Sequence, residues 1–167
     1  MKSEYINPDM VEHILYALTP ANRLVCQVCL HTGLRVGDVL QLRTADLKQR
    51  MTITEQKTGK KRRVCLTASL LRELQQQAGK VYVFEHRTDP GKHRTRQAVY
   101  LDLKRAAKAF RLKINLTPHS LRKIYAVCLY QKSCDLKKVQ AALNHEYDSV
   151  TLLYDLADVL PKNKKHP

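Results

Sequence analysis

Apolar residues recur at helical spacing through most of this sequence, and the pattern changes character only in the middle part of the chain. On both sides of that part they stand three or four positions apart, as on one face of a helix. Around Lys57-Thr58-Gly59-Lys60 they instead form two short runs that flank a glycine-containing turn, which is typical of a β-hairpin. Strands and helices do not alternate as they would in a parallel sheet. The sequence therefore predicts an α+β fold that is mainly α-helical, with a small three-stranded antiparallel sheet.

Helices and strands are predicted where the spacing continues between turn signals. The predicted helices cover residues 8–18, 21–31, 36–42, 67–79, 97–111, 118–131 and 135–143, and a short last helix begins near Asp148. The predicted strands cover residues 51–54, 63–66 and 81–84. Gly33 suits the end of the second helix, because glycine adopts the left-handed conformation without a steric penalty. Residues 86–96 contain Pro90-Gly91 and are predicted to form a mobile loop.

The charge balance narrows the class of partner. Thirty Lys and Arg residues against fifteen Asp and Glu residues give a net charge of +15 over 167 residues. Such an excess indicates a polyanionic partner, either nucleic acid or an anionic membrane. No apolar run approaches the roughly 18 residues that cross a bilayer, and no apolar segment follows residues 1–5 as a signal peptide requires. We expect a cytoplasmic protein with one domain over residues 1–160 and a basic, disordered tail over residues 161–167.

The five cysteines do not indicate a metal site. Cys26 and Cys29 have Cys-x-x-Cys spacing, but they fall in an apolar helical segment and no second pair follows them. A zinc site is therefore disfavoured, and reduced, mostly buried thiols are expected. The sequence also contains no convincing carboxylate cluster for magnesium, so neither a metal nor a cofactor is predicted.

The segment Thr117-Pro118-His119-Ser120-Leu121-Arg122 is predicted to begin a helix that suits a phosphate. Thr117 would cap the helix and Pro118 would occupy its first position. His119 and Arg122 are three residues apart and would share one face. Free backbone N–H groups, a guanidinium and an imidazole together favour phosphate binding. The same residues are also common at helix starts on protein surfaces, so this motif alone leaves both interpretations open.

Three further pieces carry candidate chemistry, and each has an ordinary structural alternative. Arg35 follows the predicted helix break and can reach over it toward a ligand, or it can pair with Asp38 in solvent. Lys57 presents an ammonium group on the hairpin turn, although most lysines in turns only keep the turn solvated. His145 precedes Tyr154 by nine residues. A tyrosine in an amphipathic helix is more often a core residue than a nucleophile, and this chain contains eight tyrosines.

Taken in order, these pieces resemble the catalytic domain of the tyrosine recombinase (phage integrase) family. The order is an arginine, a hairpin lysine, His-x-x-Arg, a histidine, and a tyrosine nine residues later. The matching stretches are residues 32–42, 56–66, 118–122 and 143–154. Four pieces in family order with suitable gaps form a specific signal, and they span nearly the whole chain. The resemblance implies the helical catalytic-domain fold of that family, with its small sheet.

The resemblance also implies a role for each of six catalytic residues. They are Arg35, Lys57, His119, Arg122, His145 and Tyr154. The two arginines would hold the scissile phosphate, and the two histidines would assist proton transfer and hydrogen-bond the phosphate oxygens. The lysine would protonate the leaving 5′ oxygen, and the tyrosine would attack to form a 3′-phosphotyrosyl intermediate. Cationic side chains can supply the charge neutralisation that metals supply in other phosphoryl-transfer sites, so neither metal nor ATP is implied.

Other basic residues are candidates for contacts with the DNA backbone, with a solvated basic face as the alternative. They are Lys60, Lys61, Arg94, Arg96, Lys104 and Lys108. The two hairpin lysines are also alternatives to Lys57 as the acid. The implied partner is double-stranded DNA with a specific attachment site, bound by a homotetramer that is monomeric when free, with no membrane. The resemblance implies a bacterial or phage-encoded, nucleoid-associated protein.

The sequence departs from the family pattern at two positions and in its extent. Asn144 stands where the family usually has a glycine, and asparagine tolerates a positive φ better than most residues. Lys123 stands where the family often has a second histidine. The family's N-terminal helical clamp domain is expected to be absent, and we favour a fragment over a natural single-domain relative. Two other functions stay open: DNA relaxation like that of type IB topoisomerases, and a catalytically silent DNA-binding domain. The second is disfavoured because all six catalytic positions hold competent residues.

Overall fold

The computed structural model describes residues 8–112 and 115–143 of the chain. In chain order, its elements are α1 (Pro8–Tyr16), α2 (Pro20–Thr32), α3 (Val36–Leu40), the 3-10 helix η1 (Thr44–Asp46), β1 (Arg50–Thr54), β2 (Lys61–Cys65), α4 (Ala68–Gln77), α5 (Arg96–Ala109), α6 (Pro118–Ser133) and α7 (Leu136–Leu143). None of the helices in these two ranges is long and apolar enough to span a membrane.

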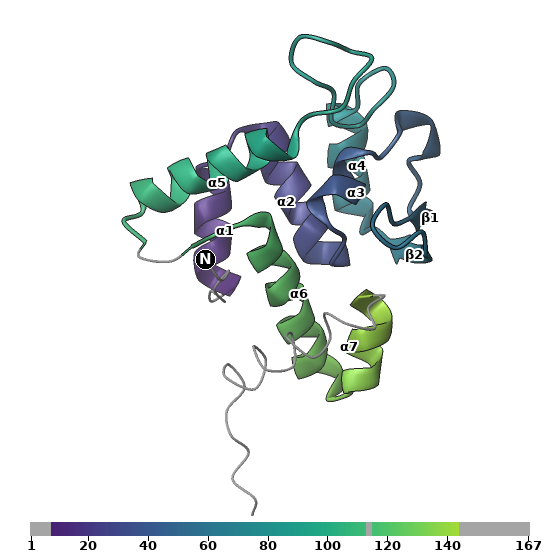
Figure 1. Ribbon diagram of the computed structural model, residues 1–167, viewed down its shortest axis with the longest axis vertical. Coiled ribbons are helices and arrows are strands. Elements are labelled where there is room, and N and C mark those ends of the chain that lie inside the picture. The colour runs from purple at the N-terminus through teal and green to yellow at the C-terminus, as the bar shows by residue number, and fades with distance from the viewer. Residues whose placement is uncertain (1–7, 113–114, 144–167) are drawn as a thin grey trace, which may run out of the picture.

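Helix α2 lies at the centre of the helical core. It packs against α1, α3, α4, α5 and α6, as Figure 1 shows. Its residues Val25, Val28 and Cys29 are wholly buried, because their spacing of three and four positions places them on the enclosed faces of the helix. Helix α6 extends away from this core, and α7 packs against its far half around Ala126 and Val139.

The predicted helices within the described residues are confirmed, and their ends agree to within two residues. Threonine side chains set three of the helix starts: Thr67, Thr95 and Thr117 each accept a hydrogen bond from the backbone N–H three residues later. The last predicted helix, near Asp148, and the predicted tail over residues 161–167 lie outside the described residues.

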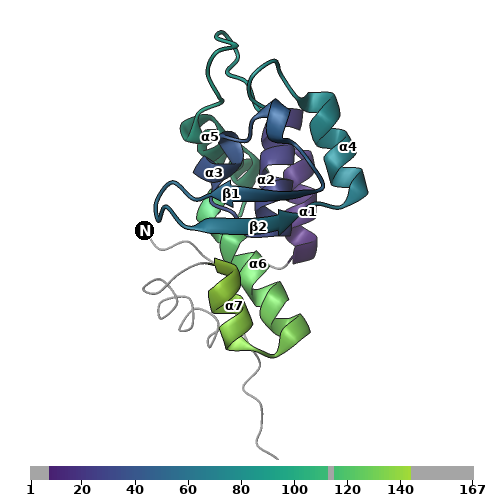
Figure 2. The same cartoon turned by 90° about the vertical axis from the view of Figure 1, so that its right-hand side faces the viewer.

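The hairpin around the central turn is confirmed as a pair of antiparallel strands. Arg50 of β1 lies opposite Cys65 of β2, and Thr54 lies opposite Lys61. Figure 2 shows the two strands side by side across one side of the helices. Val64 of β2 joins the main hydrophobic core, which fixes the hairpin against the helices.

The third predicted strand, over residues 81–84, is wrong. Tyr82 makes only an isolated antiparallel bridge to Arg43, and the sheet in the described ranges has two strands. The N–H of Val83 donates to the carbonyl of Leu42 at 2.9 Å, but the chain then enters a turn, so the pairing stops after one bridge. Val83 is wholly buried, so its apolar character reflects a buried turn rather than a strand.

The segment over residues 86–96 is a loop, as predicted. The N–H of His86 donates to the carbonyl of Lys92 at 2.8 Å, and Glu85 forms an isolated bridge with His93. The loop ends where Arg96 begins α5. Its mobility stays a prediction.

Candidate active site

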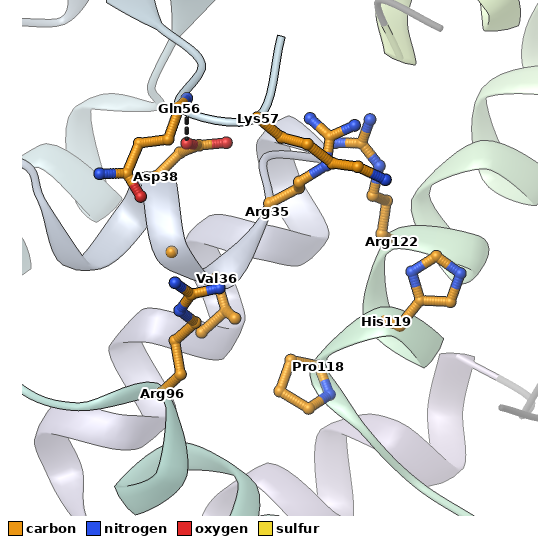
Figure 3. A pocket seen from close by; sticks show the side chains of 10 residues that line it. Arg35, Val36, Asp38, Gln56, Lys57, Arg96, Pro118, His119 and Arg122 are labelled. Atoms are coloured by element: carbon orange, nitrogen blue, oxygen red, sulfur yellow. Dashed lines mark hydrogen bonds between the residues drawn. The ribbon is translucent and has the colours of Figure 1, made fainter. Parts of the chain in front are cut away.

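A pocket of about 360 Å³ lies where α3, the hairpin turn and the starts of α5 and α6 meet (Figure 3). Four of the six predicted catalytic residues line it, although they come from separate parts of the chain. The lining residues are Arg35, Val36, Gly37, Asp38, Gln56, Lys57, Arg96, Pro118, His119 and Arg122. Three arginines, a lysine and an imidazole in one pocket make a site suited to a phosphate group.

Arg35 owes its position to the way that α2 ends. Gly33 follows the helix with φ of +65°, and its N–H donates to the carbonyl of Cys29 at 2.8 Å. A Cβ at this glycine would lie 2.2 Å from the ring of Tyr125, so the residue meets both a conformational and a steric requirement. The predicted helix end is confirmed. Two residues later, Arg35 is extended and caps α3, and its guanidinium turns toward the hairpin.

Arg122 is the most enclosed cation of the pocket. Its side chain is only 4% exposed, and its Nη1 and Nη2 donate to the carbonyls of Gly33 and Leu143 respectively. Burial and the neighbouring guanidinium groups of Arg35 and Arg62 lower the pKa of Arg122 to about 10. Arg122 therefore stays charged at neutral pH in a strongly positive setting, which an incoming anion would relieve.

The start of α6 has the predicted local structure. The side chain of Thr117 accepts from the N–H of Ser120, the side chain of Ser120 accepts from the N–H of Thr117, and Pro118 follows the cap. His119 is exposed on this first turn, while Arg122 lies one turn further along. Both side chains line the pocket, so the prediction that they share one face is confirmed.

Lys57 lies on the exposed hairpin turn. In Figure 3 its side chain extends from the turn toward the guanidinium groups of Arg35 and Arg122. The turn is closed by a hydrogen bond from the N–H of Glu55 to the carbonyl of Lys60 at 3.0 Å. Lys57 is the hairpin lysine that lines the pocket, whereas Lys60 and Lys61 are not among its lining residues.

Two buried charged residues that belong to none of the predicted motifs lie beside the pocket. Glu55 is 0% exposed, and its Oε2 lies 2.7 Å from Nη1 of Arg35. Arg62 is 8% exposed and lies 3.6 Å from Oε1 of the same glutamate. The period of β2 carried a signal for Arg62, because it alternates with the buried Val64 and so had to face the core. The sequence left open an ion pair between Arg35 and Asp38; the 2.7 Å ion pair of Arg35 is with Glu55 instead.

The predicted DNA-contacting residues do not all lie near the pocket. Arg96 lines it and lies over Gly37, where an added Cβ would be 3.5 Å from Nε of the arginine. Lys108 lies twelve residues further along α5, which at 1.5 Å per residue is about 18 Å away. Lys104 donates to the side chain of Asn115, which is a contact between elements of the fold.

The remaining candidates have varied surroundings. Lys60 and Lys61 are exposed on the hairpin, and Arg94 is half-buried at the end of the long loop, where its N–H donates to the carbonyl of Phe84 at 2.7 Å. The predicted catalytic residues His145 and Tyr154 lie outside the described residues.

The comparisons with known proteins agree on one family. A sequence model of the phage integrase family matches residues 4–159. The Bacillus subtilis (strain 168) protein named "Probable integrase/recombinase YoeC" is 31% identical over 131 residues, which cover 75% of this chain and 71% of that protein. Tyrosine recombinase XerD of Listeria innocua is 29% identical over 167 residues, which cover 89% of this chain and 56% of that protein.

Solved structures of the same architecture confirm the predicted fold class. Lambda integrase, in a dimer bound to a COC′ core site, has a TM-score of 0.78 at 21% identity, with 100% of this chain and 51% of that chain covered. XerH site-specific recombinase, bound to its difH substrate, has a TM-score of 0.71 at 25% identity, with 90% and 49% covered. This chain thus spans about half of each of these two structures. The chain belongs to the phage integrase family.

Proposed function

We propose that this chain is the catalytic domain of a tyrosine-type site-specific recombinase, or integrase, which cuts and rejoins DNA through a 3′-phosphotyrosyl intermediate. The observation that carries the proposal is the meeting of Arg35, Lys57, His119 and Arg122 in one pocket. These are the residue types that metal-free phosphoryl transfer requires, and they come from three separate segments of the chain. Family membership supports the same assignment.

Arg35 and Arg122 would bind the nonbridging oxygens of the scissile phosphate. A guanidinium presents two parallel N–H groups to a phosphate, and in an enclosed site these groups neutralise the charge that builds up as the phosphorus becomes pentacoordinate. Arg122 is held by two backbone carbonyls, so its orientation is set before DNA binds. This preorganisation lowers the reorganisation needed in the transition state.

The covalent step needs one proton to leave the nucleophile and one to reach the leaving group. The Oη of Tyr154 would form a bond to phosphorus while the bond between phosphorus and the 5′ oxygen breaks. His119 and His145 would assist removal of the tyrosine proton, and the Nζ of Lys57 would give a proton to the 5′ oxygen, which leaves as a hydroxyl. The phosphotyrosyl bond conserves the energy of the broken bond, so religation needs no ATP.

Double-stranded DNA with a specific attachment site is the proposed substrate. The net charge of +15 supports a polyanionic partner. Among the structures of similar fold, lambda integrase is described as a tetramer bound to a Holliday junction, and XerH as bound to difH. We accordingly propose that the protein is a monomer when free and a homotetramer on DNA, and that it acts in the cytoplasm at the nucleoid.

The proposal is tested by a covalent-adduct assay. The protein is incubated with nicked duplexes tiled from the DNA that flanks its own gene, and the mixture is denatured in SDS. A shifted band formed by the parent, and not by a Tyr154→Phe variant that still binds DNA, supports cleavage by tyrosine. Absence of the band with the longest natural form of the protein contradicts the proposal and favours a silent DNA-binding domain. Relaxation of supercoiled plasmid without strand exchange would favour the topoisomerase alternative.

A further inference from the structure

We infer that Glu55 is a positioning residue for this reaction: its buried carboxylate aligns Arg35 with the hairpin turn that carries Lys57. The inference rests on the proposed function, because both cations are proposed to act on the same phosphate. It adds to the six residues of the family pattern a seventh that would touch neither DNA nor the reacting atoms.

The side chain of Glu55 lies at the centre of a buried charge cluster. Its Oε2 lies 2.7 Å from Nη1 of Arg35 and accepts a hydrogen bond from Oγ1 of Thr58 at 3.2 Å. Its Oε1 lies 3.6 Å from Nη1 of Arg62. A carboxylate that is 0% exposed is unfavourable unless cations and hydrogen bonds compensate it. Here the compensation comes from α3 on one side and from the hairpin on the other.

The backbone of Glu55 closes the turn in which Lys57 lies. Its N–H donates to the carbonyl of Lys60 at 3.0 Å, and its carbonyl accepts from the N–H of Gly59 at 2.8 Å. Thr58 adds a second link, because its hydroxyl accepts from the N–H of Lys60 while it donates to Glu55. One residue therefore holds the turn with its backbone and Arg35 with its side chain.

The third guanidinium explains why a buried anion is needed here. Arg62 donates to the carbonyls of Thr32 and Gly33, and Arg122 also donates to the carbonyl of Gly33. Arg35, Arg62 and Arg122 thus surround the end of α2. Like charges gathered in one buried place repel each other strongly, because the surroundings screen them poorly. Arg35 has 20% of its side chain exposed, so it has room to turn toward solvent if the carboxylate of Glu55 is removed.

A carboxylate beside a phosphate site lowers the positive potential there. Glu55 therefore does not favour DNA binding through its charge, and its effect is geometric. Its removal should leave DNA affinity almost unchanged while the covalent step slows, since the alignment of catalytic groups controls the reaction far more steeply than it controls binding.

The first test compares single-turnover rates on a duplex with which the parent forms the Tyr154-dependent adduct. Glu55→Gln keeps the size of the side chain and removes its charge, and it is expected to form the adduct about 10–100-fold more slowly, with DNA affinity within about threefold of the parent. Glu73→Gln, at an exposed position of α4, is the matched control and should react as the parent does. A rate for Glu55→Gln within about threefold of the parent overturns the inference.

A double-mutant cycle separates positioning from a general structural effect. If Glu55 acts through Arg35, adding Glu55→Gln to Arg35→Lys should slow the reaction little beyond Arg35→Lys alone. If the two substitutions instead slow the reaction by factors that multiply in the double variant, the inference is overturned.

Thr58→Val removes the hydroxyl bound to Glu55 and provides a milder variant if Glu55→Gln does not fold. Thr52→Val, on the exposed side of β1, is its control. If Thr58→Val forms the adduct more slowly than the parent and Thr52→Val does not, the inference is supported. If the two variants react at equal rates, the inference is overturned.

A measurement without DNA distinguishes failure of the inference from failure of the proposed function. Side-chain NMR of the arginine Nε–H groups reports how freely each guanidinium rotates. In the free protein, the guanidinium of Arg35 should rotate slowly in the parent and in Glu73→Gln, and faster in Glu55→Gln. If no duplex gives an adduct, the proposed function fails, while the NMR comparison still decides whether Glu55 holds Arg35. Unchanged rotation in Glu55→Gln overturns that alignment.

Discussion

The guanidinium of Arg122 donates a hydrogen bond to the carbonyl oxygen of Gly33. This contact joins the second turn of α6 to the residue that ends α2, two positions before Arg35. The carbonyl is available because Gly33 adopts a left-handed conformation and the helix stops there. A backbone irregularity in one helix thus orients the main cation of another.

Replacing Gly33 with alanine should destabilise the domain more than the same change at Gly59. Both glycines have a positive φ, of +65° and +66°, but only at Gly33 would the added Cβ collide with a neighbour, the ring of Tyr125. We expect a loss of about 1–2 kcal/mol for Gly59→Ala and about 2–5 kcal/mol for Gly33→Ala. Urea unfolding of the two variants measures the difference, and equal losses would contradict the packing argument.

The stability of the domain should fall in acid partly through Asp102. Burial raises the pKa of this carboxyl, but hydrogen bonds from Asn22, Thr19 and Arg105 outweigh it and hold the pKa below the ordinary value. Because the folded pKa is the lower one, the stabilisation is present above the unfolded value of about 3.9 and is lost as the pH falls through the folded value. Asp102→Asn should therefore destabilise the domain at pH 7 by about 1–3 kcal/mol, with a smaller deficit in strong acid.

The matched control for this titration is Asp46→Asn in η1, where the carboxyl is exposed. Free energies of unfolding for the two variants and the parent, measured from neutral pH down to acid, show whether the deficit of Asp102→Asn shrinks as the pH falls. A deficit for Asp102→Asn that stays constant at every pH would show that the charge of Asp102 has no part in it.

If Lys57 is the general acid, the effect of replacing it should depend on the leaving group of the DNA substrate. Lys57→Ala is expected to slow adduct formation about 100–10,000-fold on ordinary DNA. Replacing the 5′ bridging oxygen with sulfur should restore most of the rate, because a thiolate leaves without a proton. Lys60→Ala is the control. It should weaken DNA binding, and the bridging sulfur should not increase its rate of adduct formation relative to the parent. A sulfur-specific recovery in Lys60→Ala instead would transfer the role to Lys60.

Arg96 and Lys108 should differ in what they contribute, although both lie on α5. Removing one phosphate contact lowers the dependence of binding on salt by about one unit of slope. Arg96→Gln should lower the salt dependence of DNA binding in this way. It should also slow the reaction at saturating DNA, because Arg96 lines the pocket. Lys108→Gln, about 18 Å further along the helix, should change binding alone. Binding titrations across salt concentrations, with single-turnover rates, measure both effects.

Local sequence patterns were sufficient to predict the helices of the described residues, the hairpin and the order of the chemical motifs. Helix ends depend on residues within one turn of the chain, such as the capping Thr117 and the left-handed Gly33, so local patterns were enough to predict them. The same patterns placed Lys57 on a turn and His119 and Arg122 on one face of a helix. These features depend only on interactions between residues that are close together in the sequence.

Long-range packing determines which charged side chains share the pocket and which do not. The alternation of β2 carried a signal that Arg62 faces the core, but no local pattern pairs Glu55 with Arg35, because the pairing joins the hairpin to α3. Nor could local spacing show that residues 81–84 form one isolated bridge and a turn, in which Val83 and Phe84 are buried, rather than a strand. Ion pairs and burial depend on long-range packing, in which the low polarity of the interior selects the partners that buried charges require.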